Sequence, residues 1–490
     1  MTETSQATPI VPPTATARPR WIALPVLALA QLMLVLDVTV VNVALPDIGS
    51  ALQLDRATLP WVMTAYTLLF GGLMLLGGRF ADLVGARRSV LLGLGVFTAA
   101  SLLCGVSQGP AVLITGRALQ GVGAAVMSPA ALAVVVSIYT GPARAKALAI
   151  WSTISGVGAA LGVILGGVLT SVAGWRWIFA INVPIGVGLL VAIPLVAPAR
   201  PAATEGRRQL DVPGALQVTA GTAALIYGLI NAGNHGWGSL TTLAAGAAAA
   251  LAFTILVQIE RRTARPLLSL ELLARRPSLA GSFLMLVATG LMVGGYFLAS
   301  FDLQHLHCYS ALHVGLAFLP MAVATVVGAQ AAGQLLQRID ARLVAVAGLA
   351  LAAAGFTIAA LWDPPAIAVT GLSVATLGIG ATFVTAFTAS LTDAPQAEAG
   401  LRSALVNTFH ELGGAAGVAV LSTVAGTALV SAAPGAHAFR GAFTVAAAIA
   451  AAGVIVSAVL VPAVRKPKAA QAGDRPAATR RQNTRKSAHM

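Results

Sequence analysis

Long apolar runs separated by short polar segments alternate along almost the whole chain. A helix needs about 20 mostly apolar residues to cross the hydrocarbon core of a lipid bilayer, because each residue adds about 1.5 Å. Fourteen runs reach that length. We therefore expect fourteen membrane-spanning helices with these limits: 21–43, 58–80, 89–107, 110–137, 146–170, 177–197, 213–232, 239–259, 277–300, 311–334, 341–361, 366–390, 403–430 and 438–463.

The composition indicates a protein embedded in the membrane. Hydrophobic residues make up 57% of the 490 positions and charged residues only 9%, whereas water-soluble proteins carry about 25% charged residues. This excludes a water-soluble globular protein. Residues 1–20 are polar and rich in proline, and no cleavage signature follows in the first apolar run. We expect 1–20 to be a disordered tail and the first span to be retained.

The basic residues lie between the apolar runs and predict the orientation of the chain. When the N-terminus is placed in the cytoplasm, every Lys and Arg falls on the inner side except Arg56, Arg117, Arg176 and Arg440. Such an excess of inner positive charge is typical of membrane proteins. Topology thus explains the net charge of +14, and no nucleic-acid partner is needed. We expect a multi-pass protein of the cytoplasmic (inner) membrane with both termini in the cytoplasm.

The second half of the chain repeats the first at an offset of 255 residues. The segment GRFADLVGAR begins at Gly78 and GQLLQRIDAR begins at Gly333, while Gly158 recurs as Gly413. Spans one to six therefore match spans nine to fourteen, and spans seven and eight form an inserted pair. Two parallel six-helix repeats are typical of secondary transporters. The predicted division is an N-terminal tail (1–20), a six-helix bundle (21–197), a cytoplasmic linker (198–212), the inserted pair (213–259), a basic cytoplasmic connection (260–276), a second six-helix bundle (277–464) and a basic disordered tail against anionic lipid (465–490).

Two charged residues lie inside predicted spans at a similar depth. Asp37 in the first span and Arg117 in the fourth each lie about seven residues, or roughly 10 Å, from the outer end. An ionisable group inside a membrane is costly and faces a cavity or a partner. Asp37 would then carry a proton, with Arg117 as its cationic neighbour and Gln120 in the same polar network. The alternatives are an acid without a role in a wet vestibule and an arginine that only binds backbone carbonyls.

The loop after the second span is a candidate inner gate. It contains Asp82, Gly85, Arg87 and Arg88, and Gly78 lies just before it at the inner end of the second span. Asp82 could hold the positive end of a neighbouring helix and so keep the inner face shut. The alternative is that these charges only set the topology.

The fifth span carries a glycine face. Gly158, Gly162 and Gly166 recur at a spacing of four, with Gly167 beside them. Such a smooth face lets another helix approach closely. The alternative is that these glycines serve helix packing alone. The functional interpretation also depends on close packing, because helices that slide past each other in a transporter need smooth surfaces.

The second half offers a further ionisable pair. His410 and Glu411 lie about two helical turns inside the thirteenth span, and they are a second candidate for proton or cation handling. A cluster around His305 and His307 is too weak a pattern for a metal site, and we expect neither a metal nor a cofactor. A phosphate loop ending in Gly-Lys-Ser/Thr is absent, so no ATP-driven step through such a loop is expected.

Several segments resemble the signature motifs of the fourteen-helix drug:proton antiporters of the major facilitator superfamily, the EmrB/QacA type. They are LDVTVVNVALP in the first span, GRFADLVGARR after the second, RALQGVGAA in the fourth, GVGAALGVILGG and WRWIFAINVPIG in the fifth and sixth, and NTFHELGGAAG in the thirteenth. The resemblance covers residues 34 to 186 and extends into the second half at Asn407. It implies the major facilitator fold, proton exchange through Asp37 and Arg117, and an inner gate at Asp82.

Three positions depart from the family pattern. Val163 stands where the antiporter motif usually has proline, so a proline kink is not expected there. Leu83 and Ala86 stand where the loop motif often has basic residues, which predicts a weaker gate. His410 and Glu411 stand where the thirteenth helix often has Arg-Gln, which adds a titratable pair.

We expect a monomeric, proton-coupled antiporter that exports amphipathic drugs or an antibiotic by alternating access. Its partners would be the small drug, protons and the lipid bilayer. One alternative is an uptake transporter of a sugar or siderophore, against which fourteen spans and the glycine face argue. Another is a membrane-embedded enzyme, which would need a clustered acid/base or metal constellation. Only 16 acidic residues are present, so we do not expect an enzyme.

Overall fold

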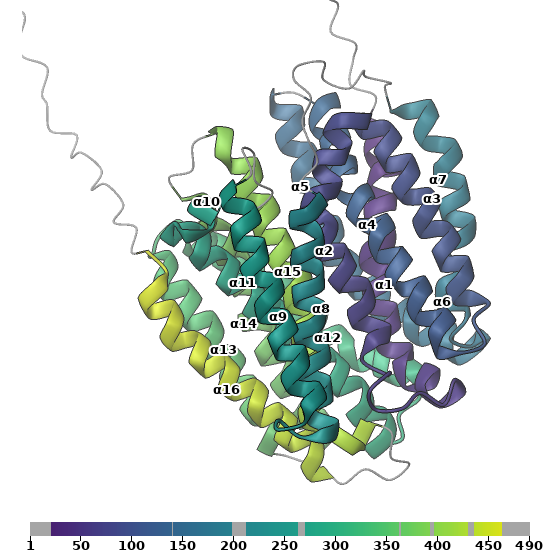
Figure 1. The fold of residues 1–490 in the computed structure, drawn as a ribbon, viewed down its shortest axis with the longest axis vertical. Coiled ribbons are helices and arrows are strands. Elements are labelled where there is room, and N and C mark those ends of the chain that lie inside the picture. The colour runs from purple at the N-terminus through teal and green to yellow at the C-terminus, as the bar shows by residue number, and fades with distance from the viewer. Residues whose placement is uncertain are drawn as a thin grey trace, which may run out of the picture.

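The computed structural model describes residues 21–139, 141–197, 212–262, 270–361, 364–392, 396–429 and 436–462. Within these ranges the chain is helical and contains no β-strand (Figure 1). The elements are α1 (Ala23–Ala51), α2 (Trp61–Val84), α3 (Ala86–Gly105), α4 (Pro110–Ile138), α5 (Gly141–Ala173), α6 (Trp177–Ala180), α7 (Asn182–Val196), α8 (Val212–His235), α9 (Leu240–Arg262), α10 (Leu270–Ala274), α11 (Arg276–Phe301), the π-helical turn η1 (Asp302–Leu306), α12 (Ala311–Leu335), α13 (Ala341–Leu361), α14 (Pro365–Leu391), α15 (Gln396–Ala425), the 3-10 turn η2 (Gly426–Leu429) and α16 (Ala436–Leu460).

The helices lie where the apolar runs predict spans. Among the described residues, 13 helical segments are long and apolar enough to cross a membrane. The fifth predicted span lies in α5, which is 33 residues long and whose described apolar segment is Leu161–Ala173. The sixth consists of the short α6 followed by α7. The prediction of an all-helical integral membrane protein is therefore confirmed.

The first helix is longer than the sequence predicts. The apolar run predicts a span that ends at residue 43, but α1 continues to Ala51. The polar side chains of Asp47 and Ser50 end the apolar run without ending the helix, and the Ser50 hydroxyl donates to the Asp47 carbonyl at 3.0 Å. The chain turns away only at Gln53, whose φ of 51° is in the left-handed region. Apolar length therefore underestimates a helix that continues beyond the hydrocarbon layer.

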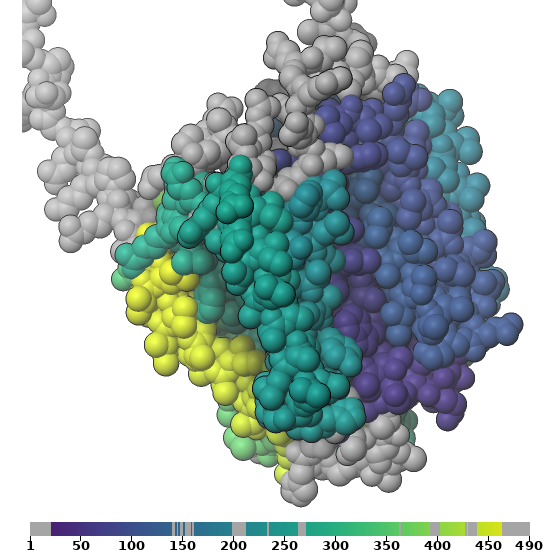
Figure 2. All heavy atoms as spheres, viewed as in Figure 1, coloured from purple at the N-terminus to yellow at the C-terminus, as the bar shows by residue number. Residues whose placement is uncertain are grey.

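The membrane helices form two bundles of six with a helical hairpin between them (Figure 1). Helices α1 to α7 pack on one another and form the first bundle, and α11 to α16 form the second. The bundles meet where α5 packs against α12 and where α2 packs against α15. The inserted helices α8 and α9 pair with each other, and α8 contacts both α2 and α15. In Figure 2 these teal helices cover the face between the first bundle and the yellow α16.

The two ends of the molecule are distinguished by the course of the chain. The described chain begins at Trp21 and ends at Pro462 at the same end, here called the terminal end. The opposite end, here called the loop end, carries the segments 52–60, 106–109 and 302–310. Hydrogen bonds between described residues join the bundles at the loop end. They run from Gln304 Nε2 to the Val43 carbonyl (2.9 Å), from the Leu312 amide to Ser171 Oγ (3.0 Å) and from Arg56 Nη2 to the Thr423 carbonyl (3.4 Å).

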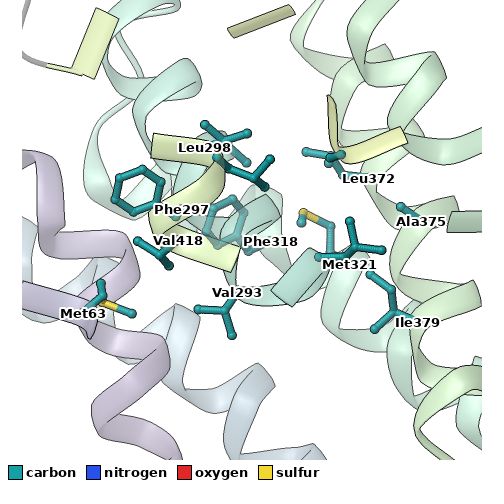
Figure 3. Close-up of a cluster of buried hydrophobic side chains, with 14 of the residues drawn as sticks. Met63, Val293, Phe297, Leu298, Phe318, Met321, Leu372, Ala375, Ile379 and Val418 are labelled. Carbon is teal, nitrogen blue, oxygen red and sulfur yellow. The ribbon is translucent and has the colours of Figure 1, made fainter. Parts of the chain in front are cut away.

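An apolar core continues from one bundle into the other (Figure 3). Phe297 and Phe318 form part of its centre in the second bundle, and Val418 of α15 lies beside them. Met63 of α2 approaches the cluster from the first bundle and is 1% exposed. Between helices in a lipid bilayer such side chains stabilise the contact mainly by van der Waals packing. The bundles are therefore held together by shared apolar packing as well as by hydrogen bonds.

Candidate functional site

Asp37 of α1 and Arg117 of α4 form an ion pair inside the first bundle. Arg117 Nη1 donates to Asp37 Oδ2, and both side chains have 0% exposure. Gln120 completes the connection, because its Oε1 accepts from Arg117 Nη1 at 2.8 Å and its Nε2 donates to Asp37 Oδ1 at 3.0 Å. The structure therefore brings Asp37 and Arg117, which the sequence placed at a similar depth, together with Gln120, which it placed in the same polar network.

Helix α2 holds the arginine from another side. Arg117 Nε donates to the Val62 carbonyl at 2.9 Å. The Tyr66 ring lies one helical turn further along α2, with its centroid 4.5 Å from the guanidinium carbon, and the Phe179 ring lies at 5.8 Å. A cation over an aromatic face is stabilised, and more so where water is excluded. Among the described residues, Arg117 Nη2 and the Tyr66 hydroxyl are buried without a hydrogen-bond partner.

Because the ion pair is buried, its stability depends on both Asp37 and Arg117 staying charged. Two charges removed from water are compensated mainly by each other and by their hydrogen bonds, and loss of one partner costs about 3–5 kcal/mol. Neutralisation of Asp37 by a proton would therefore leave Arg117 with an uncompensated buried charge. The arrangement can convert the uptake of one proton into a change of structure.

A small cavity lies next to Asp37 between α1, α5 and the α6–α7 segment. Its volume is about 350 Å³, including the open space at its mouth. Asp37 and Asn182 line it among aliphatic side chains, and Leu29, at 41% exposure, lies at its edge. The remaining lining residues are Met33, Leu36, Val40, Leu165, Ile178, Ile181 and Ile185.

The predicted glycine face contacts two different helices. A Cβ on Gly158 would lie 2.7 Å from Leu32 Cδ1, one on Gly162 would meet Thr39 Oγ1, and one on Gly166 would lie 3.0 Å from the Val40 backbone. These three glycines therefore let α5 approach α1. Gly167 instead faces α12 of the second bundle, where a Cβ would lie 2.7 Å from the Ala311 carbonyl oxygen. The sequence groups Gly167 with the other three, but it belongs to the interface between the bundles.

The inner-gate candidates lie at the terminal end. Gly85 connects α2 to α3 with a φ of 98°, a conformation that glycine adopts without strain. Arg87 Nη2 donates to the Pro194 carbonyl of α7 at 3.0 Å, a contact within the first bundle. Gly78 faces α4, where an added Cβ would lie 3.8 Å from Pro129 Cβ. The side chains of Asp82 and Arg88 are exposed.

His410 and Glu411 are neighbours in α15 but have different surroundings. His410 Nδ1 lies 2.9 Å from Thr289 Oγ1 of α11, and its ring lies 5.6 Å from the Phe383 ring of α14. The backbone at Glu411 instead packs on α2, where a Cβ on Gly71 would lie 2.6 Å from Glu411 Cβ. Glu411 is half-buried. Glu411, and not His410, is thus placed at the contact between the bundles.

The cluster of His305, His307 and Asp302 does not form a metal site within the described part of the chain, where no group of three or more potential ligands gathers. His307 Nε2 lies 4.0 Å from Asp302 Oδ2. Cys104 and Cys308 are both free thiols, the first buried and the second exposed.

Comparison with known proteins agrees with this architecture. The family model of the Major Facilitator Superfamily matches residues 27–418. The chain belongs to the Major Facilitator Superfamily. This major facilitator is 40% identical to the puromycin resistance protein of Streptomyces alboniger over 83% of its own length and 82% of that protein. It is 38% identical to the cephamycin export protein of Amycolatopsis lactamdurans (81% and 83%) and 35% identical to the lincomycin resistance protein of Streptomyces lincolnensis (84% and 85%).

Solved structures show the same fold. A bacterial homologue of the human lysosomal transporter Spinster, in an inward-facing and unoccupied conformation, matches with a TM-score of 0.65 at 17% identity, over 91% of this chain and 98% of that one. A peptide transporter matches with a TM-score of 0.62 at 16% identity, over 90% and 95%. The family model and the curated relatives confirm the superfamily predicted from the sequence motifs, and this major facilitator is a multi-pass membrane transporter, not an enzyme.

Sequence reasoning missed several members of the Asp37 network in this major facilitator. Asn182 Nδ2 donates to Asp37 Oδ1 at 3.3 Å, and Gln120 Nε2 donates to Ser101 Oγ at 2.8 Å. The Cys104 thiol lies 3.6 Å from Gln120 Oε1. Asn182 could have been found as a polar residue inside an apolar span. Ser101 and Cys104 carry no such signal, because small polar residues are common in membrane helices.

Proposed function

We propose that this transporter exports amphipathic drugs, including antibiotics, in exchange for protons. The observation that carries the proposal is the fully buried Asp37–Arg117 pair, which Gln120 and Asn182 join through hydrogen bonds. A carboxylate enclosed in this way can hold a proton without water and release it when its partners move. The resemblance to proteins named for resistance to or export of puromycin, cephamycin and lincomycin supports the cargo class.

Proton uptake by Asp37 would be coupled to alternating access through the helices that hold it. Arg117 binds Asp37 of α1 and the Val62 carbonyl of α2, while α1 rests on α5 through Gly166. Because α1, α2 and α5 all contact the second bundle, a change in the pair would reach that interface directly. In the conformation of the structure, hydrogen bonds from Gln304 and Arg56 hold the loop end together.

The orientation proposed from the basic residues places the terminal end in the cytoplasm. Arg79, Arg87 and Arg88 lie at that end, on α2 and α3, as positive charges on the cytoplasmic side do in other membrane proteins. The present conformation, which is closed at the loop end, would then be accessible from the cytoplasm, where the transporter would bind the drug. Asp82 and Gly85 would form part of the gate that closes this side in the next half of the cycle.

The proposal is tested with everted membrane vesicles that carry the transporter and an acidified interior. Addition of puromycin or lincomycin should dissipate the pH gradient, and the labelled drug should accumulate inside. Vesicles with Asp37→Asn at equal protein level should do neither. Drug accumulation that persists without a proton gradient would contradict proton coupling, and drug movement out of the vesicles would favour an uptake transporter.

A further inference from the structure

The two oxygens of the Asp37 carboxylate have different partners. Oδ2 accepts from the Arg117 guanidinium. Oδ1 accepts from two neutral amides, Gln120 Nε2 at 3.0 Å and Asn182 Nδ2 at 3.3 Å. The guanidinium repels a proton, so Oδ1 is the oxygen that takes one up. Proton uptake therefore turns Oδ1 from an acceptor into a donor, and it then needs an acceptor in place of an amide N–H.

Gln120 cannot supply that acceptor. Its Oε1 accepts from Arg117 Nη1 at 2.8 Å, and its Nε2 donates to Ser101 Oγ at 2.8 Å. The Ser101 hydroxyl already donates to the Phe97 carbonyl at 2.8 Å, so toward Gln120 it can only accept. A half-turn of the Gln120 amide would place its N–H groups against the donors of Arg117. The orientation of this amide is thus fixed at both ends.

Asn182 is not held in this way. Within the described residues its side chain makes a single hydrogen bond, the one to Asp37. Asn182 also borders the cavity between α1, α5 and the α6–α7 segment, so its amide has space on one side. The second side-chain torsion of asparagine is broad and roughly two-fold. A half-turn would exchange Nδ2 for Oδ1 beside Asp37 and break no other hydrogen bond of the described chain.

We propose that Asn182 is a positioning residue that reverses its amide when Asp37 takes up a proton. It donates from Nδ2 to the ionised carboxylate and accepts at Oδ1 from the protonated carboxyl group. Because one side chain serves both states, Asp37 keeps its contact with α7 as its charge changes. This inference rests on the proposed proton exchange and adds to it a residue that distinguishes the two states of the proton carrier.

The charged surroundings of Asp37 are the same for both orientations of the Asn182 amide. Arg117 of α4 pairs with Asp37, the Tyr66 ring of α2 lies 4.5 Å from the guanidinium carbon, and the Cys104 thiol of α3 lies 3.6 Å from Gln120 Oε1. On α1 and the helices that pack on it, the other ionisable residues are Tyr296, which packs on Phe318, and residues within six positions of a helix end: Asp47, Arg79, Asp82, Arg144, Lys146, Arg276 and His313. A change at Asn182 therefore alters a neutral hydrogen bond and no charge.

The sign of a pH shift separates reversal from fixed donation. Asn182→Leu keeps the approximate size of the side chain and removes both hydrogen-bonding groups. An amide that only donates stabilises the ionised carboxylate, so its loss would raise the pH midpoint of drug-driven proton release in everted vesicles. An amide that reverses gives the protonated form the shorter bond, O–H···O against an N–H···O of 3.3 Å, so its loss should lower the midpoint. We expect a fall of about 0.5, an approximately threefold lower proton affinity.

Gln120→Leu is the matched contrast on the same carboxylate oxygen. Because the Gln120 amide is fixed as a donor, its loss should raise the midpoint. Asn231→Leu removes a buried amide that donates to Thr241 and Thr242 in the α8–α9 hairpin, and its midpoint should equal that of wild type. Shifts of the same sign for Asn182→Leu and Gln120→Leu, or a wild-type midpoint for Asn182→Leu, would overturn the inference while the proposed function stands.

Infrared spectra of the purified protein give a readout that does not need transport. The C=O stretch of the protonated Asp37 carboxyl group, identified by its loss in Asp37→Asn, should move to higher wavenumber in Asn182→Leu because the O–H no longer donates to the amide. An unchanged band would overturn the inference. Should the leucine variant fail to reach the membrane, the flexible side chain of Asn182→Met makes the same comparison. Absence of drug-driven proton release in wild type would instead overturn the proposed function, and the infrared comparison would still decide the role of Asn182.

Discussion

Arg117 and Asp37 lie 80 positions apart in the chain, on the fourth and first helices, and pair with no solvent exposure of either side chain. A lone ionised carboxylate at this depth would be costly, and so would a lone guanidinium. Each residue therefore makes the burial of the other possible, and loss of either should impair transport.

Replacement of Asp37 by asparagine should lower the rate of drug-driven proton release at least tenfold. A tenfold loss corresponds to about 1.4 kcal/mol. Asparagine keeps the size of the side chain but cannot carry the proton. The measurement is proton release in everted vesicles at matched protein levels. Asp55→Asn is the control, because Asp55 is an exposed carboxylate that accepts from the Thr58 amide at 2.8 Å; it should behave as wild type. Full exchange by Asp37→Asn would remove Asp37 from the mechanism.

Arg117→Lys should fail in transport even though the charge is kept. The arginine donates at once to Asp37, Gln120 and the Val62 carbonyl, and a lysine ammonium cannot reproduce that planar set of donors. We expect a loss of transport of about tenfold or more, with a lower unfolding temperature in detergent. Normal drug export by this variant would mean that Arg117 acts only as a point charge.

Gly166→Ala should destabilise the protein by about 1–3 kcal/mol. The added Cβ would lie 3.0 Å from backbone atoms of Val40, which cannot move aside without shifting α1 and Asp37 with it. Gly188→Ala on α7 is the matched control, because no atom lies within 4 Å of its Cβ position. The unfolding midpoint of each purified variant measures the difference. Equal midpoints for the two would show that the α1–α5 crossing is not tightly packed.

Gln304→Leu should favour opening of the loop end. It removes the hydrogen bond from Nε2 to the Val43 carbonyl of the other bundle, worth about 1 kcal/mol net, or about a fivefold change in the equilibrium. Distances between spin labels on the two bundles at the loop end report the populations. In the control Gln53→Leu, the lost bond runs to the Ser50 carbonyl within the same segment, so the distances should stay as in wild type. An unchanged distribution for Gln304→Leu would show that this bond does not hold the conformation.

The energy source can be tested in intact cells. Cells that express the transporter should accumulate less of a fluorescent amphipathic dye than control cells. A protonophore should abolish the difference, since an inward proton is driven by about 2.3 kcal/mol per charge per 100 mV. Depletion of ATP with the proton gradient maintained should leave it intact. Efflux that survives the protonophore but stops on ATP depletion would contradict the antiport proposal.

The helices were predictable because the bilayer imposes one length on every apolar run. The polar end of α1 was not, since Asp47 interrupts the apolar pattern while the helix continues to Ala51. The depth of Asp37 and Arg117 could be estimated from rise per residue, but their contact depends on how α1 and α4 face each other. Asn182 joins the same network from α7, and no spacing along the chain connects it to the other two.

The inserted hairpin makes the two sides of the bundle unequal toward the surrounding lipid. Helix α8 rests on both α2 and α15, with Thr219 against Gly72 and the Thr423 hydroxyl donating to the Leu229 carbonyl at 3.0 Å. No corresponding helix pair is inserted at the contact of α5 with α12 among the described residues. If the bundles rock as proposed, hydrocarbon chains would meet a covered contact at α2 and α15 and an uncovered one at α5 and α12. In the proposed cycle, a solute dissolved in the bilayer would then approach the interface from the side of α5 and α12.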